Sequence, residues 1–145
     1  MDKSPVIVSA CLVGLKTRFD GKDALSHEAL ALLRGRPFIP VCPEQLGGLP
    51  TPRPQAVIAS GSGGDVLAGL CRVVDENGKD ATAEFLRGAE CVLMIAGLCG
   101  ATEAFLKEKS PSCGVKTIYK AGKPAAGEGV TAALLREKGF RLKGF

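Results

Sequence analysis

Short apolar runs alternate with helix-like segments along this chain of 145 residues. The runs whose length and flanking turn residues predict buried strands are 6–10, 38–41, 91–96 and 115–119. The segments whose caps or patterns predict helices are 26–35, 82–88, 101–107 and 131–138. A further extended segment is predicted over 66–74. This alternation predicts an α/β fold, with a single domain over residues 1–145 and a mostly parallel sheet flanked by helices, of the Rossmann-like kind.

Cysteines follow two of the predicted strands where those strands end. Cys11 follows the first strand and Cys42 the second, in which a proline indicates an irregular or edge position. A third, Cys113, lies in the proline- and glycine-containing stretch 107–114, after the helix predicted to follow the 91–96 strand. Ligands of parallel sheets bind outside the carboxyl ends of the strands, near a switch in strand order. We therefore expect one edge of the sheet to hold all three thiols.

The chain has six cysteines, and their surroundings favour free thiols. The N-terminus lacks the basic-then-apolar pattern of a signal peptide, and no apolar run approaches the length of a membrane span. Both features favour a cytoplasmic protein, in which cysteines are core residues, metal ligands or catalytic thiols rather than disulfides. Cys71 and Cys91 have apolar neighbours and are expected in the core. Cys99 is a reserve candidate for a fourth ligand near the same edge.

Three widely spaced cysteines favour an iron–sulfur cluster over zinc. A zinc ribbon would need Cys-x-x-Cys pairs, and structural zinc needs a fourth protein ligand. The one histidine, His27, falls in the first turn of a predicted helix, where we expect it to be solvated. A cubane cluster usually takes four thiolates, so with three it keeps one open iron that can act as a Lewis acid. Burial of the thiols as small hydrophobic side chains is the alternative.

Several stretches resemble the motifs of one small bacterial family. They are Ser9-Ala10-Cys11-Leu12-Val13-Gly14, Phe19-Asp20-Gly21, Pro40-Val41-Cys42-Pro43-Glu44-Gln45-Leu46-Gly47-Gly48-Leu49-Pro50-Thr51-Pro52-Arg53, Lys109-Ser110-Pro111-Ser112-Cys113-Gly114 and Gly127-Glu128-Gly129-Val130-Thr131-Ala132. The family was long labelled as of unknown function and includes the thiouracil desulfidases. The resemblance covers nearly the whole chain.

The resemblance implies a [4Fe–4S] cluster held by Cys11, Cys42 and Cys113, with one iron not ligated by protein. It implies a desulfidase that removes sulfur from a thiolated uracil, such as 2-thiouracil or a related base or nucleoside, to give uracil and hydrogen sulfide without net redox change. One departure is Lys16-Thr17-Arg18, which stands where some relatives carry another cysteine. Relatives fused to a second domain are similar to tRNA thiouridine desulfidases. Because 145 residues leave no room for such a domain, we expect a free base or nucleoside here rather than thiolated tRNA.

Five residues near the cysteines are candidates for the chemistry. Glu44 is the expected proton-transfer group, because a carboxyl in a partly dry pocket can act as a general acid or base; bonding to loop amides is its alternative role. Ser110 and Ser112 can hydrogen-bond substrate, water or cluster sulfur, or can serve only to form a turn. Asp20 and Arg53 are weaker candidates that would bind the carbonyl groups of the base or order the loops.

Two other functions remain open from the residues alone. The first is a cluster- or zinc-binding accessory protein without catalysis. The second is a thiol redox protein, which the lack of a Cys-x-x-Cys motif disfavours. The net charge of +4 is compatible with a nucleic-acid contact, but a solvated basic C-terminal segment explains it better. The sequence makes no prediction of the oligomeric state.

Overall fold

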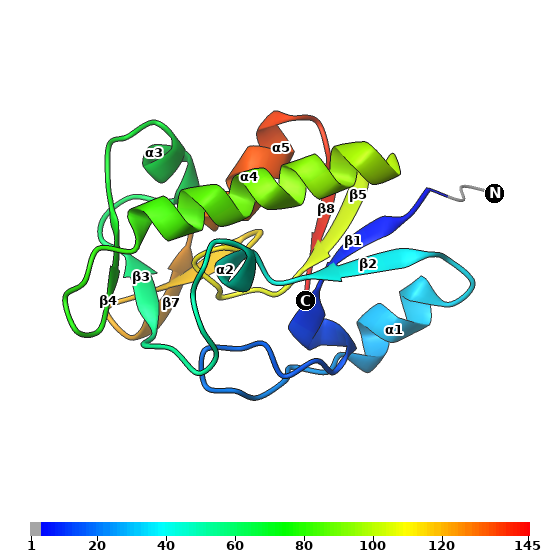
Figure 1. The fold of residues 1–145 in the computed structure, drawn as a ribbon, viewed down its shortest axis with the longest axis horizontal. Coiled ribbons are helices and arrows are strands. Elements are labelled where there is room, and N and C mark those ends of the chain that lie inside the picture. The colour runs from blue at the N-terminus through cyan, green and yellow to red at the C-terminus, as the bar shows by residue number, and fades with distance from the viewer. Residues whose placement is uncertain (1–3) are drawn as a thin grey trace.

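Four parallel strands form the central sheet of the computed structural model, which describes residues 4–145 (Figure 1). Their order is β2-β1-β5-β8, with β1 at Val6–Ser9, β2 at Phe38–Val41, β5 at Glu103–Leu106 and β8 at Arg141–Gly144. The chain passes from β1 to β2 on one side and then crosses back to β5 on the other. The strand order therefore switches at β1. Residues 1–3, where the signal-peptide pattern was sought, lie outside the described residues.

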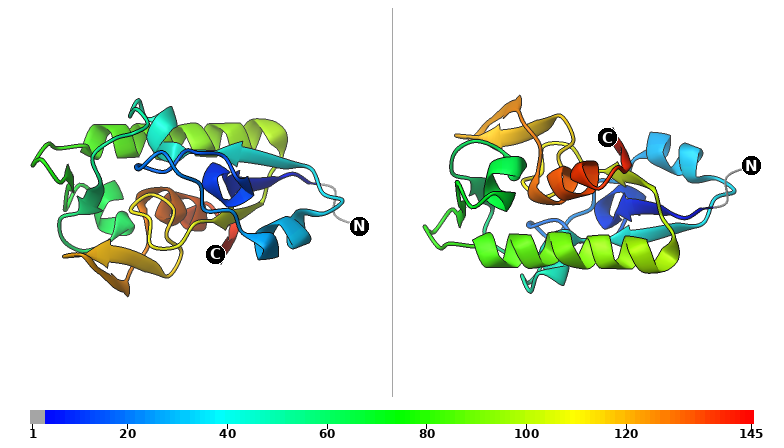
Figure 2. Two further views of the ribbon diagram at one scale, coloured as in Figure 1. Left: turned by 90° about the horizontal axis from the view of Figure 1, so that it is seen from below. Right: turned by 90° about the horizontal axis from the view of Figure 1, so that it is seen from above.

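Helices cover both faces of this sheet because its side chains alternate between them. Val6 and Val8 pack against α1 (His27–Leu33), whereas Ile7 points to the opposite face. That face is covered by α4 (Thr82–Cys99) and α5 (Val130–Glu137), which pack against each other (Figure 2). The predicted α/β fold with a parallel sheet and flanking helices is confirmed. β2 is an edge strand, as its proline indicated.

A second half of the molecule is built from two small antiparallel sheets. β3 (Ala56–Ile58) pairs with β4 (Val73–Asp75), and β6 (Thr117–Lys120) pairs with β7 (Lys123–Ala126). They share a core with α3 (Gly63–Leu67), and Phe85 of α4 lies at its centre. Figure 1 shows α4 running along both halves of the molecule. The helix thus fixes the small sheets relative to the parallel sheet.

Two of the predicted elements are wrong in type. The run 91–96, expected as a strand, belongs to α4, because its apolar residues continue a helical face that starts at Phe85. The segment 101–107, expected as a helix, contains β5, whose side chains are buried on both faces of the sheet. Cys113 therefore follows a strand directly, without the intervening helix that the sequence predicted. The segment 66–74 is not extended throughout, since it begins in α3 and ends in β4.

The short helix α2 (Pro43–Leu46) lies unusually close to α4. A methyl group on Gly88 of α4 would overlap the carbonyl oxygen of Pro43, and one on Gly47 would overlap the carbonyl oxygen of Glu84. Arg87 of α4 also donates a hydrogen bond to the carbonyl oxygen of Gly47, at 2.7 Å. Glycines on both sides thus allow α2 to pack backbone to backbone on α4. This contact fixes α2, the element that directly follows Cys42 and contains Glu44.

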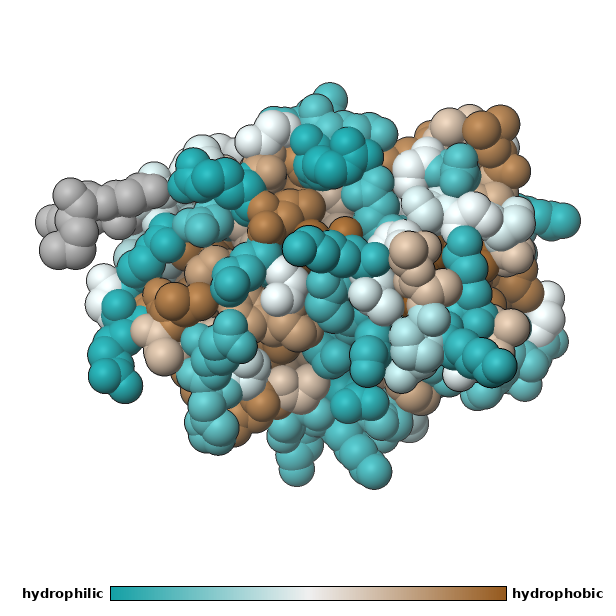
Figure 3. Space-filling model, turned by 180° about the vertical axis from the view of Figure 1, so that it is seen from behind, coloured by the Kyte–Doolittle hydropathy of each residue, from teal (hydrophilic) through white to brown (hydrophobic). Residues whose placement is uncertain are grey.

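Within residues 4–145, no helix has the length and apolar character needed to cross a membrane. Figure 3 shows hydrophilic side chains over most of the rear face, with smaller hydrophobic areas between them.

Candidate active site

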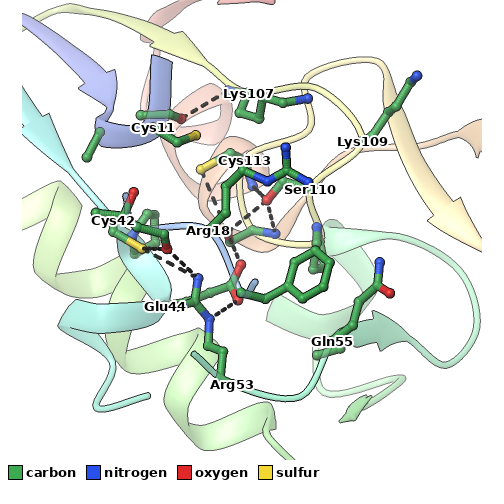
Figure 4. A pocket seen from close by; sticks show the side chains of 18 of the residues that line it. Cys11, Arg18, Cys42, Glu44, Arg53, Gln55, Lys107, Lys109, Ser110 and Cys113 are labelled. Carbon is green, nitrogen blue, oxygen red and sulfur yellow. Dashed lines mark hydrogen bonds and ion pairs between the residues drawn. The ribbon is translucent and has the colours of Figure 1, made fainter. Parts of the chain in front are cut away.

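The three predicted cysteines line one cavity at the carboxyl edge of the parallel sheet. Cys11 follows β1, Cys42 follows β2 and caps the start of α2, and Cys113 lies in the loop after β5. The cavity has a volume of about 280 Å³. Figure 4 shows the three side chains directed toward the same space. Strand ends far apart in sequence are thus brought together at the switch in strand order, as expected for a ligand site in a parallel sheet.

All three thiols are free and largely removed from water. Cys11 and Cys113 are buried, and Cys42 is partly buried. Burial raises the pKa of Cys11 to about 11 and that of Cys113 to about 12. Burial also raises the pKa of Cys42. Thiolate charge on Cys11 and Cys42 would raise the pKa of Cys113 further, so the three groups lie close enough to interact.

The donor set consists of three free thiols that line one cavity, and thiolates are the ligands that hold iron–sulfur clusters. Among residues 4–145, no group of three or more His, Cys, Asp or Glu side chains is arranged to hold one metal ion. Each thiolate of a cubane binds a different iron, so its ligands are spread more widely than around one ion. Two of the sulfurs also have polar neighbours: Ser112 Oγ lies 3.7 Å from Cys113 Sγ, and Arg53 Nη2 lies 3.8 Å from Cys42 Sγ. Such outer contacts are typical of metal-binding thiolates. The cavity therefore fits an iron–sulfur cluster on Cys11, Cys42 and Cys113.

The loop of Cys113 is held by the start of α5. The backbone amides of Val130 and Thr131 donate to the carbonyl oxygens of Pro111 and Ser112, at 2.9 and 2.8 Å. A methyl group on Gly129 would overlap the backbone between Ser112 and Cys113. The amides at a helix start have no partner within the helix, so the loop carbonyls satisfy them. This contact explains why the motif at 127–132 accompanies the cysteine motif at 109–114.

A chain of hydrogen bonds leads from Glu44 to the Cys113 loop. Ser112 Oγ donates to Glu44 Oε2 at 3.1 Å, and Ser110 Oγ lies 3.1 Å from Ser112 Oγ. Ser110 Oγ also accepts from the amides of Ser112 and Cys113, at 3.2 and 3.0 Å. Its hydroxyl hydrogen is therefore available to Ser112, and the order of donation runs from Ser110 to Ser112 to Glu44. The three candidates for proton transfer thus form one connected group beside the thiols.

Arg53 and Asp20, the two predicted substrate-binding residues, occupy different places. Arg53 lines the cavity and pairs with the other oxygen of Glu44, with Nε 2.9 Å from Oε1. Asp20 is not among the residues that line the cavity. It accepts a hydrogen bond from the amide of Lys22 and pairs with Arg18 at 3.2 Å. Asp20 therefore reaches the cavity only through Arg18, which is one of the lining residues.

Several lining residues were not among the candidate site residues of the sequence analysis. They include Thr17, Arg18, Phe19, Gln55, Lys107 and Tyr119. Burial lowers the pKa of Lys107, while the nearby Cys11 thiol acts in the opposite direction. The signal for Lys107 was its place at the start of the stretch 107–114, which contains Cys113. Gln55 immediately precedes β3 and Tyr119 belongs to β6, and neither carried such a signal.

The remaining cysteines and the histidine lie outside the lining of this cavity. Cys71 and Cys91 are partly buried. Cys99 is exposed and ends α4 just before β5 begins, so it lies toward the amino end of the sheet. Cys99, the reserve candidate for a fourth ligand, therefore lies away from the three thiols, because the segment before it is a helix running back along the sheet rather than a strand. His27 begins α1.

Comparison with known proteins links this geometry to one family. The model of the 2-thiouracil desulfurase family matches residues 6–144. The uncharacterised protein YbbK of Bacillus subtilis (strain 168) is 41% identical over 140 residues, which are 94% of this chain and 93% of YbbK. The solved structure of a [4Fe–4S]-dependent thiouracil desulfidase, TudS, is 44% identical, with a TM-score of 0.83. The match covers 98% of this chain and 91% of that chain.

Proposed function

The chain belongs to the 2-thiouracil desulfurase family, and we propose that it removes sulfur from a thiolated uracil at a [4Fe–4S] cluster held by Cys11, Cys42 and Cys113. The observation that carries this proposal is the convergence of three free thiols, two buried and one partly buried, with the Glu44 carboxylate on a single cavity. The similarity to TudS, which is [4Fe–4S]-dependent, supports the choice of cluster.

The three cysteines leave one iron of a cubane without a protein ligand. When bound, the cluster supplies at that iron a Lewis acid with an open coordination position for the sulfur of the substrate. The cysteines fix the position of this site relative to Glu44, because Cys42 and Glu44 both belong to the start of α2. The contact between α2 and α4 therefore positions a ligand and a proton-transfer group together.

The reaction replaces sulfur by oxygen and needs only water. The sum is 2-thiouracil plus water giving uracil plus hydrogen sulfide, in which no atom changes its oxidation state. Glu44 takes a proton from the attacking water and returns a proton to the departing sulfur. Ser112, 3.1 Å from Glu44 Oε2, and Ser110 extend the path along which that proton can move. These three residues carry the acid–base part of the reaction.

The substrate is a free thiolated base or nucleoside. A cavity of about 280 Å³ lies at the small end of ligand pockets, which suits a single ring rather than a structured RNA. Phe19 and Tyr119 supply aromatic surface in the lining, and Gln55 supplies an amide that can pair with the polar edge of a pyrimidine. Thiolated tRNA is a less favoured substrate. The protein functions in the cytoplasm.

Release of sulfide from 2-thiouracil tests this function. The anaerobically reconstituted protein is expected to form uracil and sulfide in equal amounts, and the cluster-free protein to form neither. Cys113→Ala, which removes a proposed ligand, should abolish sulfide release. Cys91→Ala should retain it, because Cys91 is a partly buried residue of α4 that does not line the cavity. Uracil formation by the cluster-free protein, or none by the fully loaded protein with any thiolated base or nucleoside, would contradict the proposal.

A further inference from the structure

Arg53 is buried and uses all of its hydrogen-bond donors within the protein. Its side chain is 4% exposed. A guanidinium has five N–H donors in a fixed planar arrangement. The acceptors within reach are Glu44 Oε1 for Nε, the Pro50 carbonyl oxygen and Thr51 Oγ1 for Nη1, and the Thr17 carbonyl oxygen and Cys42 Sγ for Nη2. Five donors thus meet five acceptors, and the lack of a spare donor argues against a direct role in binding the base.

We propose that Arg53 is a positioning residue that couples the cluster ligand Cys42 to the acid–base group Glu44. The inference rests on the proposed function for the roles of those two residues. This role differs from the substrate-binding role that the sequence suggested for Arg53, because binding the substrate would require a free donor. The positioning role is inferred from the guanidinium's simultaneous contacts with the Cys42 sulfur and the Glu44 carboxylate.

The contact with Glu44 fixes the orientation of its carboxylate. Arg53 Nε lies 2.9 Å from Oε1, which leaves Oε2 to accept from Ser112 at 3.1 Å. Each oxygen of the Glu44 carboxylate therefore has its own partner, Arg53 for Oε1 and Ser112 for Oε2. With Arg53 in place, only Oε2 faces the serine pair, so the proton path has one defined entry. A carboxylate without this partner would be free to rotate away from Ser112.

The contact with Cys42 acts on the ligand itself. Arg53 Nη2 lies 3.8 Å from Cys42 Sγ, within reach of an N–H···S hydrogen bond. A donor to a cluster thiolate withdraws electron density from the sulfur and makes the cluster easier to reduce. The positive charge of the guanidinium acts in the same direction. Arg53 therefore sets a property of the cluster that can be measured without substrate.

The other three contacts hold the guanidinium in place. Thr17 and Pro50 offer carbonyl oxygens at 2.9 and 3.1 Å, and Thr51 Oγ1 accepts at 2.8 Å. Thr51 Oγ1 also accepts from Gln45 of α2, at 2.7 Å. Two loops and α2 thus share one buried side chain. A lysine cannot reproduce this pattern, because its ammonium has three donors and no planar fork.

The test compares Arg53→Lys with Arg36→Lys in the anaerobically reconstituted protein. Arg36 is a matched control, since it pairs with Glu103 at 2.9 Å at the amino end of the sheet, away from the cavity. For Arg53→Lys we expect retained iron and sulfide, a more negative reduction potential in a titration without substrate, and kcat for 2-thiouracil lowered about 10- to 100-fold with KM little changed. Arg36→Lys should change none of these.

The outcomes separate this inference from the proposed function. An unchanged potential and kcat with a raised KM in Arg53→Lys would make Arg53 a substrate-binding residue and overturn the inference. If the wild-type protein holds a cluster but releases no sulfide, the function fails, and the shift in potential still decides the role of Arg53. If Arg53→Lys does not fold, Thr51→Val decides, because it removes one acceptor of Arg53 and touches neither a ligand nor Glu44. It should shift the potential and kcat in the same direction by less, and no shift would overturn the inference.

Discussion

Glu44 is the residue whose two oxygens link the halves of the site. One oxygen pairs with Arg53 and the other accepts from Ser112. We predict that Glu44→Gln keeps the cluster and substrate binding but loses about a hundred- to ten-thousand-fold in kcat, because glutamine keeps the shape and cannot act as a base. Sulfide release measured together with iron content in the same sample tests this. Near-normal release at full iron content would assign Glu44 a structural role and leave the protons to the serines.

The thiols differ in burial, and alkylation of the cluster-free protein should reveal it. The thiolate is the reactive form, and burial raises the pKa of Cys11 to about 11 and of Cys113 to about 12. Both are therefore protonated at neutral pH, and their reactivity should grow only as the pH rises toward these values, with Cys113 last. Exposed Cys99 should react first. Mass spectrometry of alkylated peptides gives the order, and early labelling of Cys113 near neutral pH would contradict the buried site.

The sequence predicts which cysteines share the cavity better than it predicts the contacts that surround them. Cys11 and Cys42 could be placed because each follows a short apolar run, and strand ends meet at one edge of a parallel sheet. The role of Arg53 could not be predicted in the same way. Two of its acceptors are backbone carbonyl oxygens, at Thr17 and Pro50, and any residue type would offer the same atom. For Asp20 the sequence left two roles open, and its contacts with the amide of Lys22 and with Arg18 are those of a residue that orders the loop.

At the scale of elements, the approach of α2 to α4 positions Cys42 and Glu44. We predict that Gly88→Ala lowers stability by about 1–3 kcal/mol and impairs cluster assembly, because the added methyl group would overlap the carbonyl oxygen of Pro43 and push α2 away. Gly97→Ala on the same helix is the control. No atom lies within 4 Å of a methyl group there, so it should stabilise the helix by about 0.5–1 kcal/mol. Chemical denaturation and iron analysis measure both effects. Equal behaviour of the two variants would show that the close contact has no role.

The two elements that were wrong in type share a physical cause. Short apolar runs do not distinguish a buried strand from a buried helix segment. In α4 the distinguishing signal extends beyond the run, since the buried residues Phe85, Ala89, Val92 and Ala96 recur with a helical period. In β5 the signal is weak, because charged residues flank Ala104, Phe105 and Leu106. Tertiary burial on both faces of the sheet decides its conformation.

At the scale of the whole molecule, the site joins parts that fold around separate cores. The cysteines follow β1, β2 and β5, while the apolar cores lie on the two faces of the sheet and in the second half. We predict that removing the cluster with a chelator lowers Tm but leaves the fold intact, because a ligand bound only to the folded state adds to stability without supplying the core. Far-UV circular dichroism during thermal unfolding tests this. Loss of secondary structure at room temperature would mean that the cluster is required for folding.

The central claim is that three cysteines hold a cubane whose remaining iron is free to meet the substrate. Mössbauer spectroscopy of the anaerobically reconstituted protein, enriched in the iron isotope it detects, tests it most directly. We predict iron and sulfide in equal amounts, with one iron site distinct from the others and altered on addition of 2-thiouracil, while the remaining sites keep their parameters. Stoichiometric zinc without sulfide, or a cluster whose iron sites are all alike and unaffected by 2-thiouracil, would contradict the account.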